Sequence, residues 1–192
     1  MSNGAETPDP AEVEAFASKA RAHLGVTEHP VELQPVAALA ATIRAVLEGL
    51  RADLASLASL APGVAVEHVG ATALPDGLTK GDVDVALSVP LDRFGPVVEA
   101  LTERFSIAQP QNWTATYASF ADDGRDLPVG IQVSVAGSAD DFLVALRDRF
   151  AGDASLRRRY DAVKTEAVPR GPAVYWEAKN AFLQTLLADL RP

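Results

Sequence analysis

The chain has 192 residues, 48% of them hydrophobic, which is enough for one domain with a substantial core. Its formal net charge is -9, from 26 acidic and 17 basic residues, which argues against nucleic acid or an anionic membrane as the main partner. The sequence contains no cysteine and only three histidines. This composition excludes disulfides, thiolate zinc sites and a cysteine nucleophile, and it disfavours a histidine-rich metal centre.

The N-terminal segment is acidic and combines proline, glycine and serine with few large apolar residues. We expect residues 1–30 to form a mobile or loosely docked arm and residues 31–192 to form a single domain. The segment lacks the basic and apolar regions of a secretory signal, and no stretch reaches the roughly 18 apolar residues of a membrane span. We therefore expect a cytoplasmic protein without a membrane partner.

A long helix is predicted to begin near Pro35 and to end near Pro62, because apolar residues recur every three or four positions. These residues are Val36, Leu39, Ile43, Val46, Leu50, Leu54 and Leu57. Two strands are predicted next, at residues 64–69 and 82–89, because β-branched residues are frequent in both. The segment between the two strands is rich in glycine and proline and is expected to form turns.

A second helix is predicted at residues 91–104, followed by a hairpin of strands at 113–120 and 129–135. Three helices should complete the chain. Ser138 and Asp141 resemble the capping residues of the first, Asp153 can cap the second, and the third follows Pro172. Because the strands cluster in the middle, we expect an α+β fold with a short mixed central sheet, packed by helices, and a helical C-terminal part.

Two carboxylates carry the main chemical signal. Asp82 and Asp84 are two positions apart in a predicted strand, so both side chains should point to one face. Like charges in this arrangement repel each other, and a divalent cation removes the conflict. Mg²⁺ commonly takes one or two carboxylates together with substrate phosphates, which makes the pair a candidate metal and catalytic site.

A turn at Gly70 precedes the acidic strand. Glycine allows a phosphate to approach the backbone closely, and the amides of Gly70, Ala71 and Thr72 are candidates to bind it, together with the Thr72 hydroxyl. Lys80 is a further candidate for a phosphate, although it equally suits a solvated loop.

Further candidates are less specific. Arg147, Lys164 and Lys179 on the C-terminal helices can bind nucleotide phosphates, and the alternative is a solvated helical face. Tyr175 and Trp176 can stack on a base, or they can pack the helix on the core. Glu67 and His68, just before the turn, have either a structural role or a place at the phosphate site.

The run from Gly70 to Val85 is similar to the nucleotidyltransferase superfamily pattern, in which a Gly-Ser turn precedes an Asp-hydrophobic-Asp strand. More narrowly, the chain resembles the GrpB family over about residues 31–190. The residues that carry this resemblance are Glu67–Pro75, Gly77–Lys80, Leu146–Asp148, Tyr160 with Val163–Lys164, and Glu177–Phe182.

The resemblance implies a nucleotidyltransferase-like fold and transfer of a nucleoside monophosphate from a nucleoside triphosphate to an unknown small acceptor, with Mg²⁺. A nucleotide-binding or regulatory protein with little or no catalysis is the alternative, and an interaction domain without a ligand is a third.

Three features depart from the family pattern. Ala71 replaces the usual serine of the turn. Many members carry the acid pair two residues later, which would match Asp84 and Ala86, but Asp82 and Asp84 fit the superfamily without a gap. Gly130 and Gln132 occupy positions where relatives often carry histidines, and the two hairpin strands contain no third carboxylate. Phosphate and metal binding are therefore better supported by the sequence than turnover.

Overall fold

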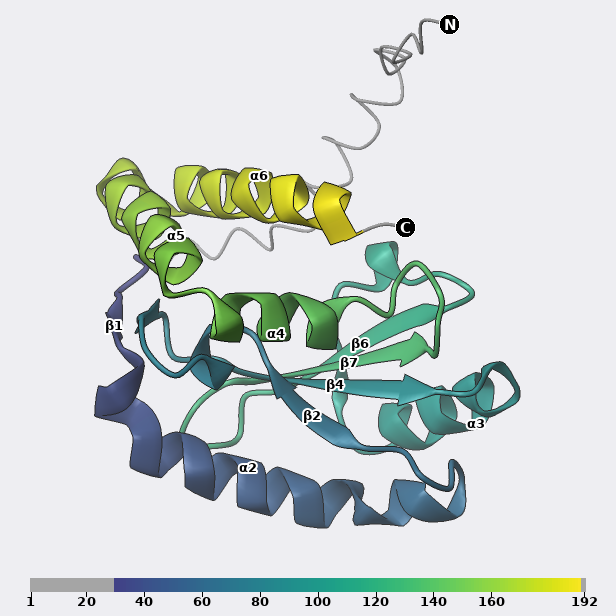
Figure 1. Ribbon diagram of the computed structural model, residues 1–192. Coiled ribbons are helices and arrows are strands. Elements are labelled where there is room, and N and C mark those ends of the chain that lie inside the picture. The colour runs from purple at the N-terminus through teal and green to yellow at the C-terminus, as the bar shows by residue number, and fades with distance from the viewer. Residues whose placement is uncertain (1–29, 191–192) are drawn as a thin grey trace, which may run out of the picture.

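The structure is a computed structural model that describes residues 30–190. The expected N-terminal arm, residues 1–30, lies outside the described residues except for its last position. Figure 1 shows a central sheet with helices on both sides. Within the described part of the chain, no helix combines the length and the apolar character needed to cross a membrane.

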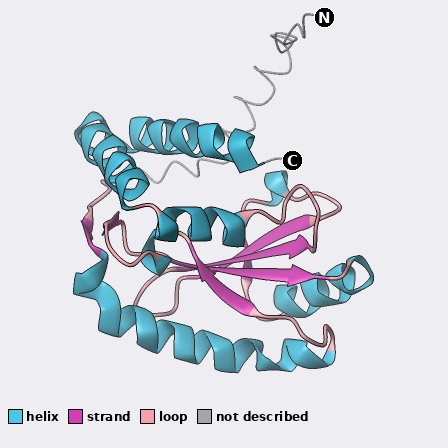
Figure 2. Cartoon of the chain, in the orientation of Figure 1, coloured by secondary structure: helices cyan, strands magenta, loops and turns pink. Residues whose placement is uncertain are grey.

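The sheet has five strands in the order β2-β4-β7-β6-β5. These strands are β2 (Val66–Val69), β4 (Val83–Val89), β7 (Val129–Val135), β6 (Tyr117–Asp122) and β5 (Ser106–Ile107). The central strands β4 and β7 are parallel, and the other neighbours are antiparallel, so the sheet is mixed. The predicted α+β class with a mixed sheet and a helical C-terminal part is thus confirmed (Figure 2).

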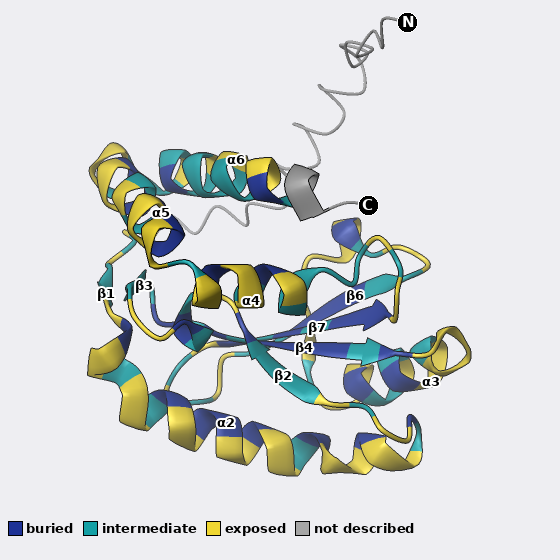
Figure 3. Cartoon of the chain, viewed as in Figure 1, coloured by how far each residue is buried: buried dark blue, intermediate teal, exposed yellow. Residues whose placement is uncertain are grey.

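One face of the sheet packs on the helices before and after β4. These are α2 (Ala40–Leu54), extended by the 3₁₀ turns η1 (Val36–Leu39) and η2 (Ala55–Ser59), and α3 (Leu91–Thr102). Alternate valine, leucine and isoleucine residues of β4 and β7 point to this side and are almost fully buried. Figure 3 shows the buried side of α2 turned to the sheet, which accounts for the three- and four-residue spacing of its apolar residues.

Three helices lie on the opposite side of the sheet, the first of them next to the sheet and the other two packed against that helix (Figure 1). They are α4 (Leu143–Gly152), α5 (Ala154–Ala167) and α6 (Pro172–Leu190), with the turn η5 (Val168–Arg170) between the last two. They form a second apolar cluster that includes one residue from outside the three helices. Its buried members are Leu74, Leu146, Phe150, Leu156, Tyr160 and Leu186. The part of the chain that the structure describes therefore forms two hydrophobic clusters, one on each side of the sheet.

Polar contacts join the C-terminal helices to the segment that leads from β2 to β4. This segment contains η3 (Ala71–Ala73) and β3 (Leu78–Thr79), and β3 pairs with β1 (Gln34–Pro35). The Arg157 guanidinium binds both oxygens of Asp76 at 2.6 and 2.9 Å. The Arg157 side chain also donates to two carbonyls at the end of α4, so it fixes α4, α5 and the loop together.

Two details of the predicted elements are wrong. The strand predicted at 113–120 begins only at Tyr117, because Pro110 starts the 3₁₀ turn η4 (Pro110–Asn112) and Trp113 packs its ring 5.3 Å from that of Phe120. The predicted cap by Asp141 is absent: α4 begins at Leu143, and the Asp141 carboxylate instead accepts bonds from Ser88 and Ser134. The predicted cap by Asp153 is confirmed, since its side chain accepts from the amide of Leu156.

Candidate functional site

Asp82 and Asp84 lie at the start of β4, on the side of the sheet that faces the C-terminal helices. Asp82 precedes the strand, and Asp84 is its second residue. Val83 and Val85 are completely buried in the other face, and side chains alternate along a strand, so Asp84 points away from that core. The register places Asp84 between Val69 of β2 and Gly130 of β7.

Two glycines make room for the Asp84 carboxylate. A methyl group on Gly70 would lie 2.5 Å from Oδ2 of Asp84, and one on Gly130 would lie 2.5 Å from Oδ1. Gly70 also has a φ of 73°, which side chains other than glycine rarely adopt. Any larger residue at either position would therefore displace the carboxylate.

The environment of Asp84 opposes its ionisation. Burial and the nearby charge of Asp82 raise the pKa of Asp84 to about 7, although Lys179, Lys80 and a hydrogen bond from Gln132 act in the opposite direction. That bond runs from Gln132 Nε2 to Asp84 Oδ1 over 3.0 Å. Because the pKa of Asp84 is near neutral pH, an additional cation nearby would favour its ionised form.

Asp82 behaves differently because a lysine pairs with it. Burial opposes ionisation of Asp82 as well, but the charges of Lys80 and Lys179 outweigh it and hold the pKa of Asp82 below its usual value. Lys80 Nζ lies 2.9 Å from Asp82 Oδ2. The two carboxyl groups therefore share one environment, but their pKa values are shifted in opposite directions.

Trp176 of α6 contacts the two lysines at this site. Lys179 Nζ lies 4.5 Å from the centre of the indole ring, and Lys80 Nζ lies 5.2 Å from it. Both distances are typical of cation–π contacts. The indole Nε1 is buried and has no hydrogen-bond partner among the described residues. Helix α6 thus brings a second positive charge to the acid pair from far along the chain.

The Thr72 hydroxyl holds the glycine turn against the acidic strand. It donates to the carbonyl oxygen of Asp82 at 3.0 Å, so it must accept from Nε2 of His68, also at 3.0 Å. Burial, with the charges of Arg51 and Arg147, lowers the pKa of His68 to about 4. His68 is consequently neutral near pH 7, and Thr72 is engaged inside the protein with an exposed fraction of only 4%.

Arg147 and Lys164 have partners that tie the C-terminal helices to the loop. Arg147 Nη1 binds the carboxylate of Glu67 at 2.8 Å and the carbonyl of His68 at 3.0 Å. Lys164 is 2% exposed, pairs with Asp161 at 2.8 Å and donates to the carbonyl of Leu78. Of the four candidate basic residues, Lys80 and Lys179 are the two whose positive charges lower the pKa of both aspartates. The structure therefore places these two lysines at the acid pair.

Among the described residues of the neighbouring strands, no third carboxylate lies beside the acid pair. The register continues from Asp84 through Gly130 to Ala121 of β6, neither of which carries an ionisable side chain. In residues 30–187, no three histidine, cysteine, aspartate or glutamate side chains form a group suited to a metal ion. Two carboxylates on one side still match Mg²⁺, which completes its coordination with water and substrate phosphates.

Comparison with known proteins decides the family. The family model described as GrpB protein matches residues 34–189, which is most of the chain. The chain belongs to the GrpB family. The predicted resemblance is thus confirmed, and it covers the sheet, the acid pair and all three C-terminal helices.

Two relatives of this GrpB-family protein are similar along much of their length. A UPF0157 protein of Vibrio cholerae serotype O1 is 24% identical over 133 residues, which are 69% of this chain and 71% of the relative. The crystal structure of the conserved protein GrpB from Enterococcus faecalis aligns with a TM-score of 0.61 at 16% identity. The alignment covers 78% of this chain and 92% of that chain, so the two proteins share a fold.

Some residues of the GrpB-family site were not assigned a role from the sequence. Gln132 was noted only as a departure from the family, yet its amide binds Asp84. Its place two residues after Gly130, on a strand beside β4, is the signal that links both residues to the acid pair. Tyr160 was noted only as part of the resemblance; burial and then the charges of Asp82 and Asp84 raise its pKa. No local spacing connects α5 with β4.

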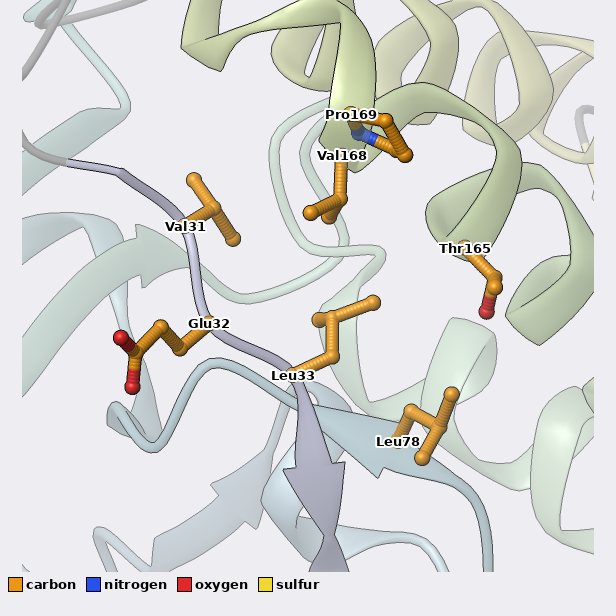
Figure 4. A pocket seen from close by; sticks show the side chains of 7 residues that line it. All are labelled: Val31, Glu32, Leu33, Leu78, Thr165, Val168 and Pro169. Atoms are coloured by element: carbon orange, nitrogen blue, oxygen red, sulfur yellow. The ribbon is translucent and has the colours of Figure 1, made fainter.

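A cavity of about 580 Å³ lies away from these polar groups, between the first described residues and the end of α5. Figure 4 shows Val31, Leu33 and Leu78 on one side and Val168 and Pro169 on the other. The lining is mainly apolar, and its charged residue, Glu32, is an anion. This chemistry does not suit a nucleotide phosphate, so the acid pair remains the candidate functional site.

Proposed function

We propose that this GrpB-family protein is a nucleotidyltransferase that uses Mg²⁺ to transfer a nucleoside monophosphate from a nucleoside triphosphate to a small acceptor. The observation that carries the proposal is the position of the Asp84 carboxylate between Gly70 and Gly130, beside Asp82. Two carboxyl groups in one partly buried site repel each other, and a divalent cation that binds both would add to the compensation that Lys80 and Lys179 provide. A nucleotidyltransferase-like fold is part of the same proposal.

The proposed reaction joins an acceptor oxygen or nitrogen to the α-phosphorus and breaks the bond between that phosphorus and the bridging oxygen to the β-phosphate. Pyrophosphate leaves with the electron pair, and the acceptor loses its proton to solvent or to a nearby base. A bound Mg²⁺ would neutralise charge on the phosphates as this exchange proceeds. Asp82 and Asp84 would hold the ion in this scheme.

The remaining residues have binding roles in the proposal. Lys80 and Lys179 would bind phosphate oxygens, since both ammonium groups lie at the acid pair. The backbone amides from Gly70 to Thr72 would contact the triphosphate from the turn. Arg147 and Lys164 would contribute by holding the loop in place, because their side chains already bind Glu67, Asp161 and Leu78.

A second candidate function is nucleotide binding without efficient turnover. It is favoured by Gly130 and Ala121, the residues beside Asp84 on β7 and β6, since neither can accept a proton from the acceptor. A regulatory protein that retains the phosphate site needs no such group. The two candidate functions share a ligand and differ in whether pyrophosphate is released.

Calorimetric titration with ATP, GTP, CTP and UTP, each with and without Mg²⁺, tests the shared part of both functions. We expect at least one nucleotide to bind, and to bind more tightly with Mg²⁺. No heat with any of the four would contradict both functions and favour an interaction domain without a ligand. Pyrophosphate release, followed against hydroxyl and amine acceptors, then distinguishes transfer from binding alone.

A further inference from the structure

Two ammonium groups lie at the acid pair before any ligand binds. Asp82 and Asp84 supply two carboxyl groups, and Lys80 and Lys179 supply two ammonium groups that act on both. Lys80 occupies Oδ2 of Asp82 directly, at 2.9 Å. A divalent cation that approaches this carboxylate therefore meets a competing positive charge already in contact with it.

Both ammonium groups contact one aromatic ring, and that of Lys80 also contacts a carboxylate. Lys80 and Lys179 lie 5.2 and 4.5 Å from the centre of the Trp176 ring. Lys80 keeps an exposed fraction of 30% in its side chain, so it is not locked in the interior. An ammonium group on a four-carbon chain can exchange one oxygen partner for another with little rearrangement of the backbone.

We propose that the Lys80 ammonium group is an exchangeable counter-ion: it occupies Asp82 in the ligand-free protein and moves to a phosphate oxygen when a divalent cation binds the two aspartates. This inference rests on the proposed metal and phosphate site. No covalent bond changes in the exchange. Trp176 acts as a positioning residue that keeps Lys80 and Lys179 next to the incoming phosphates.

The exchange makes the cation and the polyphosphate bind together. Mg²⁺ alone must displace Lys80 from Asp82 and leave its charge without a partner, while a polyphosphate alone must approach two carboxyl groups. When both bind, the ion takes the carboxylates and the ammonium group takes a phosphate oxygen. The affinity for each should therefore rise in the presence of the other, and by the same factor.

The test is calorimetric titration of the full chain with Mg²⁺ alone, with inorganic tripolyphosphate alone, and with each in the presence of the other. Wild type should bind each weakly alone, and more tightly by about tenfold or more when the other is present. In Lys80→Met, Asp82 has lost its partner, so Mg²⁺ alone should bind about tenfold more tightly than to wild type. Tripolyphosphate with Mg²⁺ should bind this variant more weakly.

Controls separate the exchange from a general loss of positive charge. Lys80→Arg keeps the charge at Asp82 and should leave the weak affinity for Mg²⁺ alone unchanged. Arg93→Met frees the exposed carboxylate of Asp92, which its side chain contacts at 3.2 Å, and should not create tighter Mg²⁺ binding. Thermal unfolding of every variant verifies that it is folded, and Lys80→Gln replaces Lys80→Met if the latter is not.

Two results overturn the inference: unchanged or weaker affinity of Lys80→Met for Mg²⁺ alone, or, in a wild-type protein that does bind tripolyphosphate, equal affinity for Mg²⁺ with and without it. Failure of the proposed function has a different signature. In that case wild type does not bind tripolyphosphate under any condition, whereas the comparison of Mg²⁺ binding between wild type and Lys80→Met still reports on the contact with Asp82.

Discussion

A methyl group on Gly130 would lie 2.5 Å from Oδ1 of Asp84, well inside van der Waals contact. Gly130 does not have the positive φ that favours glycine, so the backbone alone does not require this residue. The Asp84 side chain on the neighbouring strand does require it. The glycine at this position is therefore explained by the space that the Asp84 carboxylate occupies.

Gly130→Ala should move the Asp84 carboxylate without straining the backbone. We expect the affinity for a nucleoside triphosphate with Mg²⁺ to fall by about tenfold or more, because ligands must be held to within a fraction of an ångström. The loss of stability should be modest, about 1–3 kcal/mol, as is typical of overpacking. Titration and urea denaturation measure the two effects. Gly152→Ala is the control, since a methyl group there meets nothing within 4 Å.

Gly70→Ala combines a steric clash with backbone strain, and Gly137→Ala separates the two. The φ angles of Gly70 and Gly137 are 73° and 72°, but a methyl group on Gly137 has open space around it. Both variants should lose about 1–3 kcal/mol from a backbone conformation that side chains rarely adopt, and Gly70, with a ψ of -168°, lies in a region that is essentially restricted to glycine. Gly70→Ala should lose about 1–3 kcal/mol more, because its methyl group meets Asp84. Equal unfolding free energies for the two variants would show that the contact with Asp84 is not tight.

Asp84→Asn should stabilise the ligand-free protein near neutral pH. The folded protein raises the pKa of Asp84 from 3.8 to about 7, so the ionised form is disfavoured by folding. The contribution of the protonated Asp84 side chain to the stability of wild type is fully present below about pH 4, and it is lost as the pH rises towards 7. We expect the variant to be more stable by on the order of 2 kcal/mol above pH 7. Urea denaturation between pH 4 and pH 8 measures the difference, which should shrink at the acidic end.

Lys164→Met should weaken the attachment of the C-terminal helices. Lys164 is 2% exposed, and its loss leaves Asp161 and the carbonyl of Leu78 without this partner. Removing one member of a buried pair costs about 3–5 kcal/mol, and the partial exposure of Asp161 reduces the expected loss to about 2–3 kcal/mol. Arg158→Met, on the exposed side of the same helix, should change stability by about 0.5 kcal/mol or less. Urea denaturation compares them, and similar losses would indicate that the buried pair contributes little.

The sequence predicted those parts of the fold that depend on local pattern. The apolar spacing of α2 and the alternation in β4 each reflect one buried face, so both elements could be located from the chain alone. Asp141 shows where the local pattern failed. It suited a helix cap, but hydroxyl groups of Ser88 and Ser134 on neighbouring strands are its partners. Nothing in the sequence near Asp141 indicates these contacts, because they depend on how the strands pack.

In the candidate site, too, only the local features could be predicted from the sequence. The spacing of Asp82 and Asp84 within one strand is a local signal, and so is the turn at Gly70. The approach of Lys179 and Trp176 from α6 depends on the packing of helices about 95 residues further along the chain, which spacing does not encode. Lys164 has a favourable charge, but burial and its pair with Asp161 give it a structural contact that composition does not reveal.

The central claim is that Asp84 forms, with Asp82, a metal-dependent site for a nucleoside triphosphate. Its most direct test is calorimetric titration of wild type, Asp84→Asn and Asp92→Asn with ATP, GTP, CTP and UTP in the presence of Mg²⁺. Asp92 is exposed on α3 and provides the control for loss of one carboxylate. We expect Asp92→Asn to bind as wild type does and Asp84→Asn to lose the binding that depends on Mg²⁺. Unchanged affinity in Asp84→Asn would contradict the assignment of the site.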